Sequence, residues 1–321
     1  MTPLPALPRL AQADRPVVIA SLFVLVILAL GSAYTLATQG TLAFLQPAYL
    51  LQQLQVGAFL GIIAAGLMLV ILLGHIDLSV PWTVAAAAMM ATAVGGPLAI
   101  PVGLSVGLAV GLLNGVGVAF LRVPSMIFTL GVNAVMRGLM VMHTGGFAPQ
   151  THSTPLMEYL ATGRVLGMPM PLVVWAAVSL AVVFLLQRTV FGRYVYAIGN
   201  REAAAYLSGV NTRGVLVGCF ALSGLCAGLA GVLLAGYSTK AYQGMGDPYL
   251  LPAIAAVVIG GTNILGGQGR YLGTVVGAVL ITLLSSVLSV MQMPEAGRQV
   301  IYGVVIIGML LVYGRGQRAQ A

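Results

Sequence analysis

Residues 187–214 read QRTVFGRYVYAIGNREAAAYLSGVNTRG and form the one extended polar stretch in a chain made mostly of long apolar runs. Four of the fourteen basic residues of the chain lie in it: Arg188, Arg193, Arg201 and Arg213. A charged segment between two apolar runs long enough to cross a lipid bilayer is typical of a loop that joins two membrane-spanning helices. The stretch therefore predicts a membrane protein with one well-developed polar loop.

Within this loop, residues 201–208 are predicted to form a short helix. Asn200 is placed to cap its first turn, and Gly209 to end it in a left-handed turn. A membrane protein that presents one short polar helix to the cytosol is expected to use it for docking a partner. The candidate partner-coupling residues are Asn200, Arg201, Glu202, Ala203, Ala204, Leu207, Ser208 and Gly209.

The composition points the same way. Of 321 residues, 60% are hydrophobic and 6% are charged, and the mean hydropathy is +1.04. An ordinary soluble domain has about a quarter of its residues charged, so this chain has too little polar surface to cover a water-soluble body. We therefore expect an all-α polytopic protein in which residues 1–321 form a single transmembrane domain within the lipid bilayer.

Ten apolar runs are candidate membrane spans: 17–37, 48–73, 80–95, 98–120, 124–143, 170–187, 214–236, 249–261, 271–291 and 299–314. With the amino terminus in the cytosol, ten basic residues fall in cytosolic segments, three in outer segments and Arg137 within a span. The positive-inside rule then predicts cytoplasmic termini, a cytoplasmic loop over 188–213 and an outer loop over 144–169. The net charge of +8 thus marks topology, and no basic and aromatic cluster indicates nucleic-acid binding.

Two of the ten runs are short. The run at 80–95 ends at Gly95-Gly96-Pro97, and the run at 249–261 continues into a glycine-rich segment, 260–269. Each is the third span of its half of five, and short or broken spans at matching places in two inverted halves indicate a transport path. Ordinary tilted helices with misplaced boundaries are the alternative. In the outer loop, a short helix is expected near residues 154–161, as a binding surface or a plain connector.

The linker between the second and third runs carries Asp77, with Ser79 and Pro81 placed to begin the next helix. Asp77 either lines a path or holds a helix break, or it belongs to a capped turn at the cytosolic membrane edge. Asn114 and Asn133 are expected to make interhelical hydrogen bonds, and Arg137 either faces the interior or extends to the outer surface. The candidates for a translocation path or helix break are Asp77, Ser79, Asn114, Thr129, Asn133 and Asn263.

Catalytic chemistry finds no support in the sequence. No Ser/His/Asp or Cys/His set is evident, and His75 has too few nearby ligands for a metal site. Residues 260–269 lack the Gly-Lys-Ser/Thr ending of a phosphate-binding loop, so we interpret them as a turn that allows close backbone approach. We expect no catalytic residues, no metal, no cofactor and no ATPase site in this chain. Cys219 and Cys226 are interpreted as packing residues, too far apart for a disulfide.

Four blocks of the sequence resemble a known family. Residues 74–80 (GHIDLSV) are similar to the Gly-Gly-Ile-Asp-Leu-Ser-Val motif of permeases in bacterial ATP-binding cassette (ABC) sugar importers of the ribose, xylose and autoinducer-2 type. Residues 123–131 (VPSMIFTLG) with 137–139, then 197–204 (AIGNREAA) with 207–210, and the glycines at 260–274 resemble its later blocks, in order. His75 and the pair Pro81-Trp82 depart from the family pattern, which leaves local conformation and substrate contact there open.

The resemblance implies a permease of the bacterial inner membrane that pairs with a second permease subunit, identical or different. It also implies a cytosolic ABC ATPase that binds ATP and contacts the helix near residue 202, and a periplasmic binding protein that delivers the sugar. An ion-coupled secondary transporter that uses Asp77 is the alternative, and a structural or receptor-like subunit without a path is a third. The sugar remains open among pentoses, hexoses, deoxysugars, polyols and a furanosyl signal molecule.

Overall fold

The computed structural model describes residues 15–147 and 149–318, with the side chains of residues 15, 305 and 308–318 outside the description. The predicted single domain and cytoplasmic termini include residues 1–14 and 319–321, which lie outside the described residues. The first half contains α1 (Arg15–Gln39), η2 (Ala43–Leu45), α2 (Pro47–Leu72), α3 (Val80–Val94), η3 (Gly96–Leu98), α4 (Ala99–Leu121) and α5 (Ser125–Thr144). The connecting region contains α6 (Pro155–Thr162), β1 (Arg164–Val165) and β2 (Met168–Pro169). The second half contains α7 (Met170–Arg188), α8 (Val190–Asn200), α9 (Glu202–Leu207), α10 (Thr212–Ser238), η4 (Asp247–Tyr249), α11 (Leu250–Ile259), α12 (Tyr271–Val290) and α13 (Glu295–Arg318).

Each predicted span contains a helix, and seven of the described helices are long and apolar enough to cross a membrane. The seven begin at residues 16, 47, 96, 125, 170, 212 and 271. The prediction of an all-α polytopic membrane protein is therefore confirmed. The two short spans are also short in the structure, because α3 has 15 residues and α11 has 10. Gly95, with φ +63°, ends α3 in a conformation that favours glycine.

Helix α2 forms the centre of the bundle, since 83% of its apolar window is buried. It packs against α10, α12 and α7, while α10 also packs against α4 and α3. Helices α4 and α10 approach closely through glycines: a Cβ atom on Gly107 would lie 2.3 Å from the Gly224 carbonyl oxygen. Small residues at such crossings let membrane helices pack backbone to backbone, which explains part of the high glycine content. Helices α1, α5 and α7 bury at most 22% of their apolar windows.

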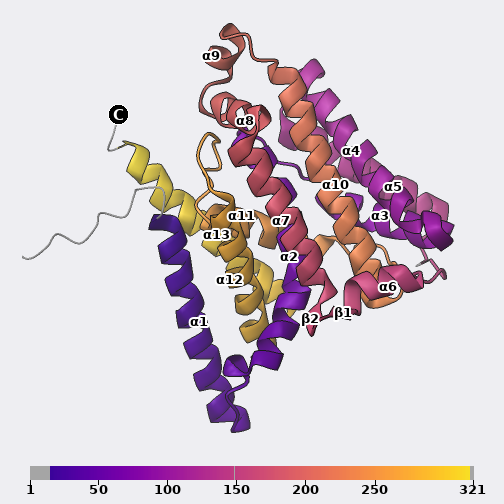
Figure 1. Ribbon diagram of the computed structural model, residues 1–321, viewed down its shortest axis with the longest axis vertical. Coiled ribbons are helices and arrows are strands. Elements are labelled where there is room, and N and C mark those ends of the chain that lie inside the picture. Colours follow the sequence, from indigo (N-terminus) through magenta and orange to yellow (C-terminus); the bar gives the residue numbers. More distant parts are fainter. Residues whose placement is uncertain (1–14, 148, 319–321) are drawn as a thin grey trace, which may run out of the picture.

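The two polar connections lie at opposite ends of the bundle (Figure 1). Helices α8 and α9 stand at one end, and α6 with the β1–β2 hairpin at the other. Helix α1 begins and α13 ends toward the end that carries α8 and α9. The predicted short helix near residues 154–161 is confirmed as α6, and Thr154 caps it by accepting a hydrogen bond from the Met157 N–H.

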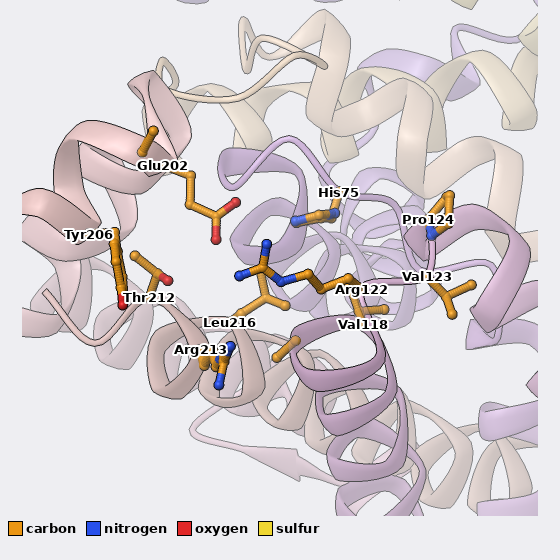
Figure 2. Close-up of a pocket in the computed structure, with 12 residues that line it drawn as sticks. His75, Val118, Arg122, Val123, Pro124, Glu202, Tyr206, Thr212, Arg213 and Leu216 are labelled. Atoms are coloured by element: carbon orange, nitrogen blue, oxygen red, sulfur yellow. The ribbon is translucent and has the colours of Figure 1, made fainter.

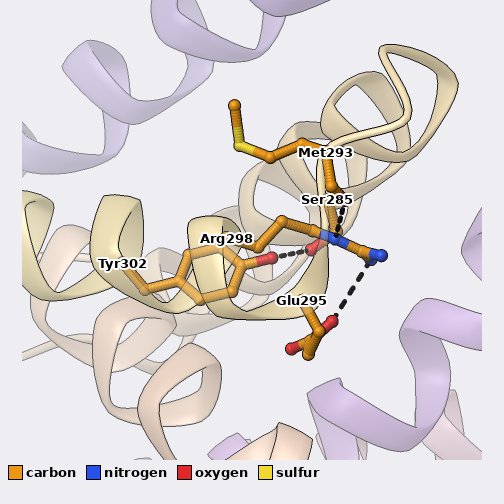
Figure 3. A network of polar contacts seen from close by, with 5 residues as sticks. All are labelled: Ser285, Met293, Glu295, Arg298 and Tyr302. Atoms are coloured by element: carbon orange, nitrogen blue, oxygen red, sulfur yellow. Dashed lines mark hydrogen bonds and ion pairs between the residues drawn. The ribbon is translucent and has the colours of Figure 1, made fainter.

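The turn between α12 and α13 is held by polar contacts (Figure 3). Arg298 lies 3.4 Å from the Glu295 carboxylate and donates through Nε to the Met293 carbonyl oxygen at 3.3 Å. The hydroxyl groups of Ser285 and Tyr302 are hydrogen-bonded across the two helices. These contacts fix the start of α13 against α12.

Candidate functional site

Asp77 lies in the linker between α2 and α3 and is buried, with 1% of its surface exposed. Its Oδ1 accepts hydrogen bonds from the Ser79 N–H at 3.0 Å, the Ser79 hydroxyl at 2.6 Å and the Asn114 amide at 3.4 Å. Its Oδ2 accepts one from the Ser223 hydroxyl at 3.3 Å. The carboxylate thus joins the linker to α4 and α10. The expected turn contact with the backbone is present in the bond from the Ser79 N–H, and the position of Asp77 relative to the membrane edge stays a prediction.

Ser79 occupies the N-cap position of α3, but its side chain makes no cap hydrogen bond. The prediction of a side-chain cap is therefore wrong. The hydroxyl instead donates to Asp77 at 2.6 Å and accepts from the Asn114 Nδ2 at 2.7 Å. Asn114 makes the interhelical hydrogen bonds that we expected, while its buried Oδ1 has no partner among the described residues.

Three polar side chains on one face of α5 bind the backbone of the linker and of α3. Ser125 accepts from the Ile76 N–H at 3.3 Å, and Thr129 accepts from the Leu78 N–H at 2.9 Å. Asn133 accepts from the Trp82 N–H at 3.3 Å. Buried backbone N–H groups must be paired, and irregular backbone at membrane depth is stable only when protein supplies the partners. These residues therefore stabilise the interruption between α2 and α3.

Sequence reasoning singled out Thr129 and Asn133 but missed Ser125. The signal was available, because serine, threonine and asparagine recur at four-residue spacing and so share a helix face. Asn263 does not belong to this cluster. It accepts a hydrogen bond from the Leu265 N–H at 3.0 Å and thereby shapes the glycine-rich segment. Arg137 lies on an exposed face of α5, with its guanidinium 6.0 Å from the Trp82 ring.

The glycine-rich segment at 260–269 allows close backbone approach, as predicted. The Gly267 N–H donates to the Leu72 carbonyl oxygen at 2.9 Å, where α2 ends. A Cβ atom on Gly199 would lie 2.0 Å from that same oxygen and 2.5 Å from the Gly267 nitrogen. The Tyr196 hydroxyl donates to the Gly269 carbonyl oxygen at 2.8 Å. The end of α8, the end of α2 and the glycine-rich segment are therefore in direct contact.

The polar loop contains two helices, and sequence reasoning found only the second. Helix α8 begins after Thr189, whose hydroxyl accepts from the Gly192 N–H at 3.2 Å, and it buries Val195 and Ile198. Its signal was a threonine followed by apolar residues at three- to four-residue spacing. We refer to residues 190–207 as the α8–α9 segment.

The predicted cap at Asn200 is wrong. Asn200 is the last residue of α8, and its side chain donates back to the Tyr196 carbonyl oxygen at 2.9 Å. Arg201 is extended and precedes α9 without a side-chain cap. The left-handed turn at Gly209 is confirmed by its φ of +81°. On α9, the side chains of Tyr206 and Leu207 are 68% and 85% exposed, so this short helix presents apolar surface to its surroundings.

A cavity of about 470 Å³ lies between α9, the end of α4 and the start of α10. It is lined by His75 of the linker, Glu202 and Tyr206 of α9, Arg122 after α4, and Arg213 of α10. Figure 2 shows the Arg122 guanidinium extending into the space between His75 and the Glu202 carboxylate. Burial lowers the pKa of His75, and the charge of Glu202 opposes that shift.

The fold and these sites define a multi-pass membrane protein with a buried polar cluster in the linker between α2 and α3 and a polar two-helix segment at one end. Residues 49–310 match the family model described as "Branched-chain amino acid transport system / permease component", so the chain belongs to this permease family. It is a transport subunit of the inner membrane.

Several relatives are similar over most of their length. The ribose import permease protein RbsC of Escherichia coli (strain K12) is 37% identical over 276 residues, 84% of this chain and 85% of that protein. RbsC of Bacillus subtilis (strain 168) is 38% identical, over 84% of this chain and 86% of that protein. The autoinducer 2 import system permease protein LsrC of Salmonella paratyphi B is 33% identical, over 79% and 75%. No solved structure matches the chain significantly.

Proposed function

We propose that this chain is the permease subunit of an ABC importer that carries a sugar or sugar-like solute into the cytoplasm. A separate ATPase binds and hydrolyses the ATP, and the permease alternates between outward-open and inward-open states. The observation that carries the mechanism is the backbone contact between Gly199, Leu72 and Gly267. Through it, a push on the α8–α9 segment reaches the linker that holds Asp77.

The surfaces of the chain support a place for each proposed partner. The ATPase docks on α9, where Tyr206 and Leu207 are exposed. A second permease subunit covers α5, whose apolar window is 11% buried and would otherwise expose Arg137 to lipid. The binding protein meets the opposite end of the bundle, near α6 and the β1–β2 hairpin. Ribose is the first solute to test, because two of the relatives are named as ribose permeases.

The test is uptake of radiolabelled ribose into proteoliposomes that contain the tagged chain and the ATPase co-purified with it, with the outer binding protein added. We expect uptake only when ATP is enclosed in the lumen, where it reaches the ATPase. Leucine and a hexose serve as competitors, because the family model is named for amino-acid transport. Inhibition by leucine alone would overturn the sugar assignment.

The same assay separates the alternative of an ion-coupled transporter. That alternative requires a membrane-embedded carboxylate, and Asp77 is buried within the bundle. Uptake by the purified chain alone, driven by a proton or sodium gradient, would overturn the proposed function. ATP-dependent uptake that is indifferent to both gradients would support it.

A further inference from the structure

The cavity beside α9 has the size and the polar lining of a small-molecule site. Its volume of about 470 Å³ falls within the range of about 300–1,000 Å³ that is usual for ligand pockets. Its floor is apolar, because Val118, Ala119 and Leu216 are all at least 92% buried. The charged and hydroxyl-bearing side chains of the lining come from α9, from the α4–α5 turn and from the start of α10.

The charged groups are of mixed sign, which restricts the class of ligand. Two guanidinium groups, those of Arg122 and Arg213, suit a phosphate, since arginine binds phosphate oxygens in a bidentate manner. The Arg213 guanidinium lies 5.4 Å from the ring of Phe120, which does not itself line the cavity. The Glu202 carboxylate accepts hydrogen bonds and would repel a ligand that carried only negative charge.

A ligand with both a phosphate group and free hydroxyl groups satisfies this lining. The phosphate binds Arg122 and Arg213, and the hydroxyl groups donate to Glu202 and exchange hydrogen bonds with Tyr206 and Thr212. From this geometry we infer that the cavity is a regulatory site for a hydroxylated phosphate monoester or diester on the cytoplasmic side. Two sources share that chemistry: a free sugar phosphate, and the headgroup of phosphatidylglycerol.

The inference rests on the proposed function, because that function places the cavity in the cytoplasm. A sugar phosphate is the product of the class of reaction that consumes an imported sugar, namely its phosphorylation by a kinase. The cavity has Glu202 and Tyr206 on one wall and His75, two residues from Asp77, on another. A bound ligand therefore ties α9 to the linker and opposes the relative movement that transport requires. Accumulated product would slow further import.

Binding is measured by isothermal titration calorimetry of the full chain in nanodiscs, with ribose 5-phosphate as the probe. In nanodiscs of phosphatidylcholine alone, we expect saturable binding at one site, with inorganic phosphate binding more weakly. Arg122→Ala and Arg213→Ala should each weaken binding about tenfold, as loss of a charge-assisted hydrogen bond does. Arg193→Ala is the matched control, since Arg193 is an exposed arginine of α8 that does not line the cavity.

Nanodiscs containing phosphatidylglycerol distinguish the two sources. If the soluble ligand is the natural one, ribose 5-phosphate binds equally well with and without this lipid. If the phosphatidylglycerol headgroup is the natural ligand, native mass spectrometry should show the lipid bound to the wild-type chain and absent from Arg122→Ala. Absence of binding in both arms, or equal affinities for Arg122→Ala and Arg193→Ala, would overturn the inference.

Transport by the intact complex is followed in parallel. Enclosed ribose 5-phosphate should inhibit ATP-driven ribose uptake by the wild type and by Arg193→Ala, but not by Arg213→Ala. If enclosed ribose 5-phosphate does not inhibit ATP-driven uptake by the wild type, the regulatory site is rejected and the proposed function is not. Uptake that needs no ATPase would reject the proposed function, whatever the calorimetry shows.

Discussion

Gly199, the penultimate residue of α8, lies against the carbonyl oxygen of Leu72, the last residue of α2, so closely that a Cβ atom there would stand 2.0 Å away. Backbone cannot be displaced as easily as the end of a flexible side chain. The end of α8 and the end of α2 therefore meet backbone to backbone at this contact. Leu72 leads directly into the linker that carries His75 and Asp77.

We expect Gly199→Ala to disrupt the contact between the end of α8 and the end of α2. The added methyl group has no space, and overpacking of this kind costs about 1–3 kcal/mol of folding free energy. The rate of uptake should fall more than the rate of ATP hydrolysis. The ATPase still binds α9, but movement of the α8–α9 segment is no longer transmitted to the linker between α2 and α3. The ratio of uptake to hydrolysis in proteoliposomes measures this. Gly131→Ala is the control, since no atom of another described segment lies within 4 Å of the added atom. Equal ratios in the two variants would contradict the prediction.

Thr129→Val should destabilise the protein without changing side-chain volume appreciably. It leaves the Leu78 N–H without its acceptor, and a buried unpaired group costs about 1–3 kcal/mol. Thermal unfolding in detergent measures the loss. Thr38→Val is the matched control, because the exposed Thr38 hydroxyl donates to the Tyr34 carbonyl oxygen of its own helix. A melting temperature as low for Thr38→Val as for Thr129→Val would count against the role given to α5.

Asp77→Ala and Asp77→Asn should differ. The alanine variant leaves the Ser79 N–H and the Ser223 hydroxyl without acceptors, at about 1–3 kcal/mol each. The asparagine variant keeps one carbonyl oxygen, and its amide can donate to Ser223. We therefore expect Asp77→Asn to fold and to retain ATP-driven uptake. Complete loss of uptake by a well-folded Asp77→Asn protein would instead favour a carboxylate that carries a proton or an ion.

The stability of the protein should depend on pH through His75. Because burial lowers the pKa of His75 in the folded state, the unfolded state binds more protons as the pH falls below the usual value of 6.5. The contribution of the neutral His75 imidazole to folding stability is therefore present above pH 6.5 and is lost as the pH falls below it. Between pH 5 and 7.5, the melting temperature should change less steeply with pH for His75→Gln than for the wild type. Identical slopes would contradict this.

Much of the fold could be predicted from the sequence, because apolar runs of about 20 residues have few structural outcomes. The short helices α3 and α11 were visible as interrupted runs, and Gly209 was recognised as a helix end. The errors at Asn200 and Ser79 share a physical cause. In both cases a side chain suited to capping found a different partner, the Tyr196 carbonyl oxygen or the Asp77 carboxylate, and only the tertiary structure reveals that competition.

The site was predicted in part. Asn114 and Asn133 were selected as polar residues in apolar spans and Thr129 as a further path candidate, and the structure brings all three to the linker around Asp77 or to the start of α3 beside it. Asn263 was selected with them but lies in the glycine-rich segment. The cavity beside α9 could not be predicted, since its lining comes from segments of the chain far apart in the sequence. Arg122, with a φ of +53°, gave no sequence signal of its unusual conformation.

The central claim is that α9 faces the cytoplasm and is the surface to which a separate ATPase binds. Labelling of Leu207→Cys with a membrane-impermeant maleimide tests it most directly, because Leu207 is 85% exposed and the native Cys219 and Cys226 lie within α10. Leu166→Cys is the matched control, since Leu166 is 99% exposed in the hairpin at the other end. We predict that Leu207→Cys is labelled only in inverted vesicles and is protected by the ATPase, whereas Leu166→Cys is labelled only in intact spheroplasts. Labelling of Leu207→Cys in intact spheroplasts would contradict the account.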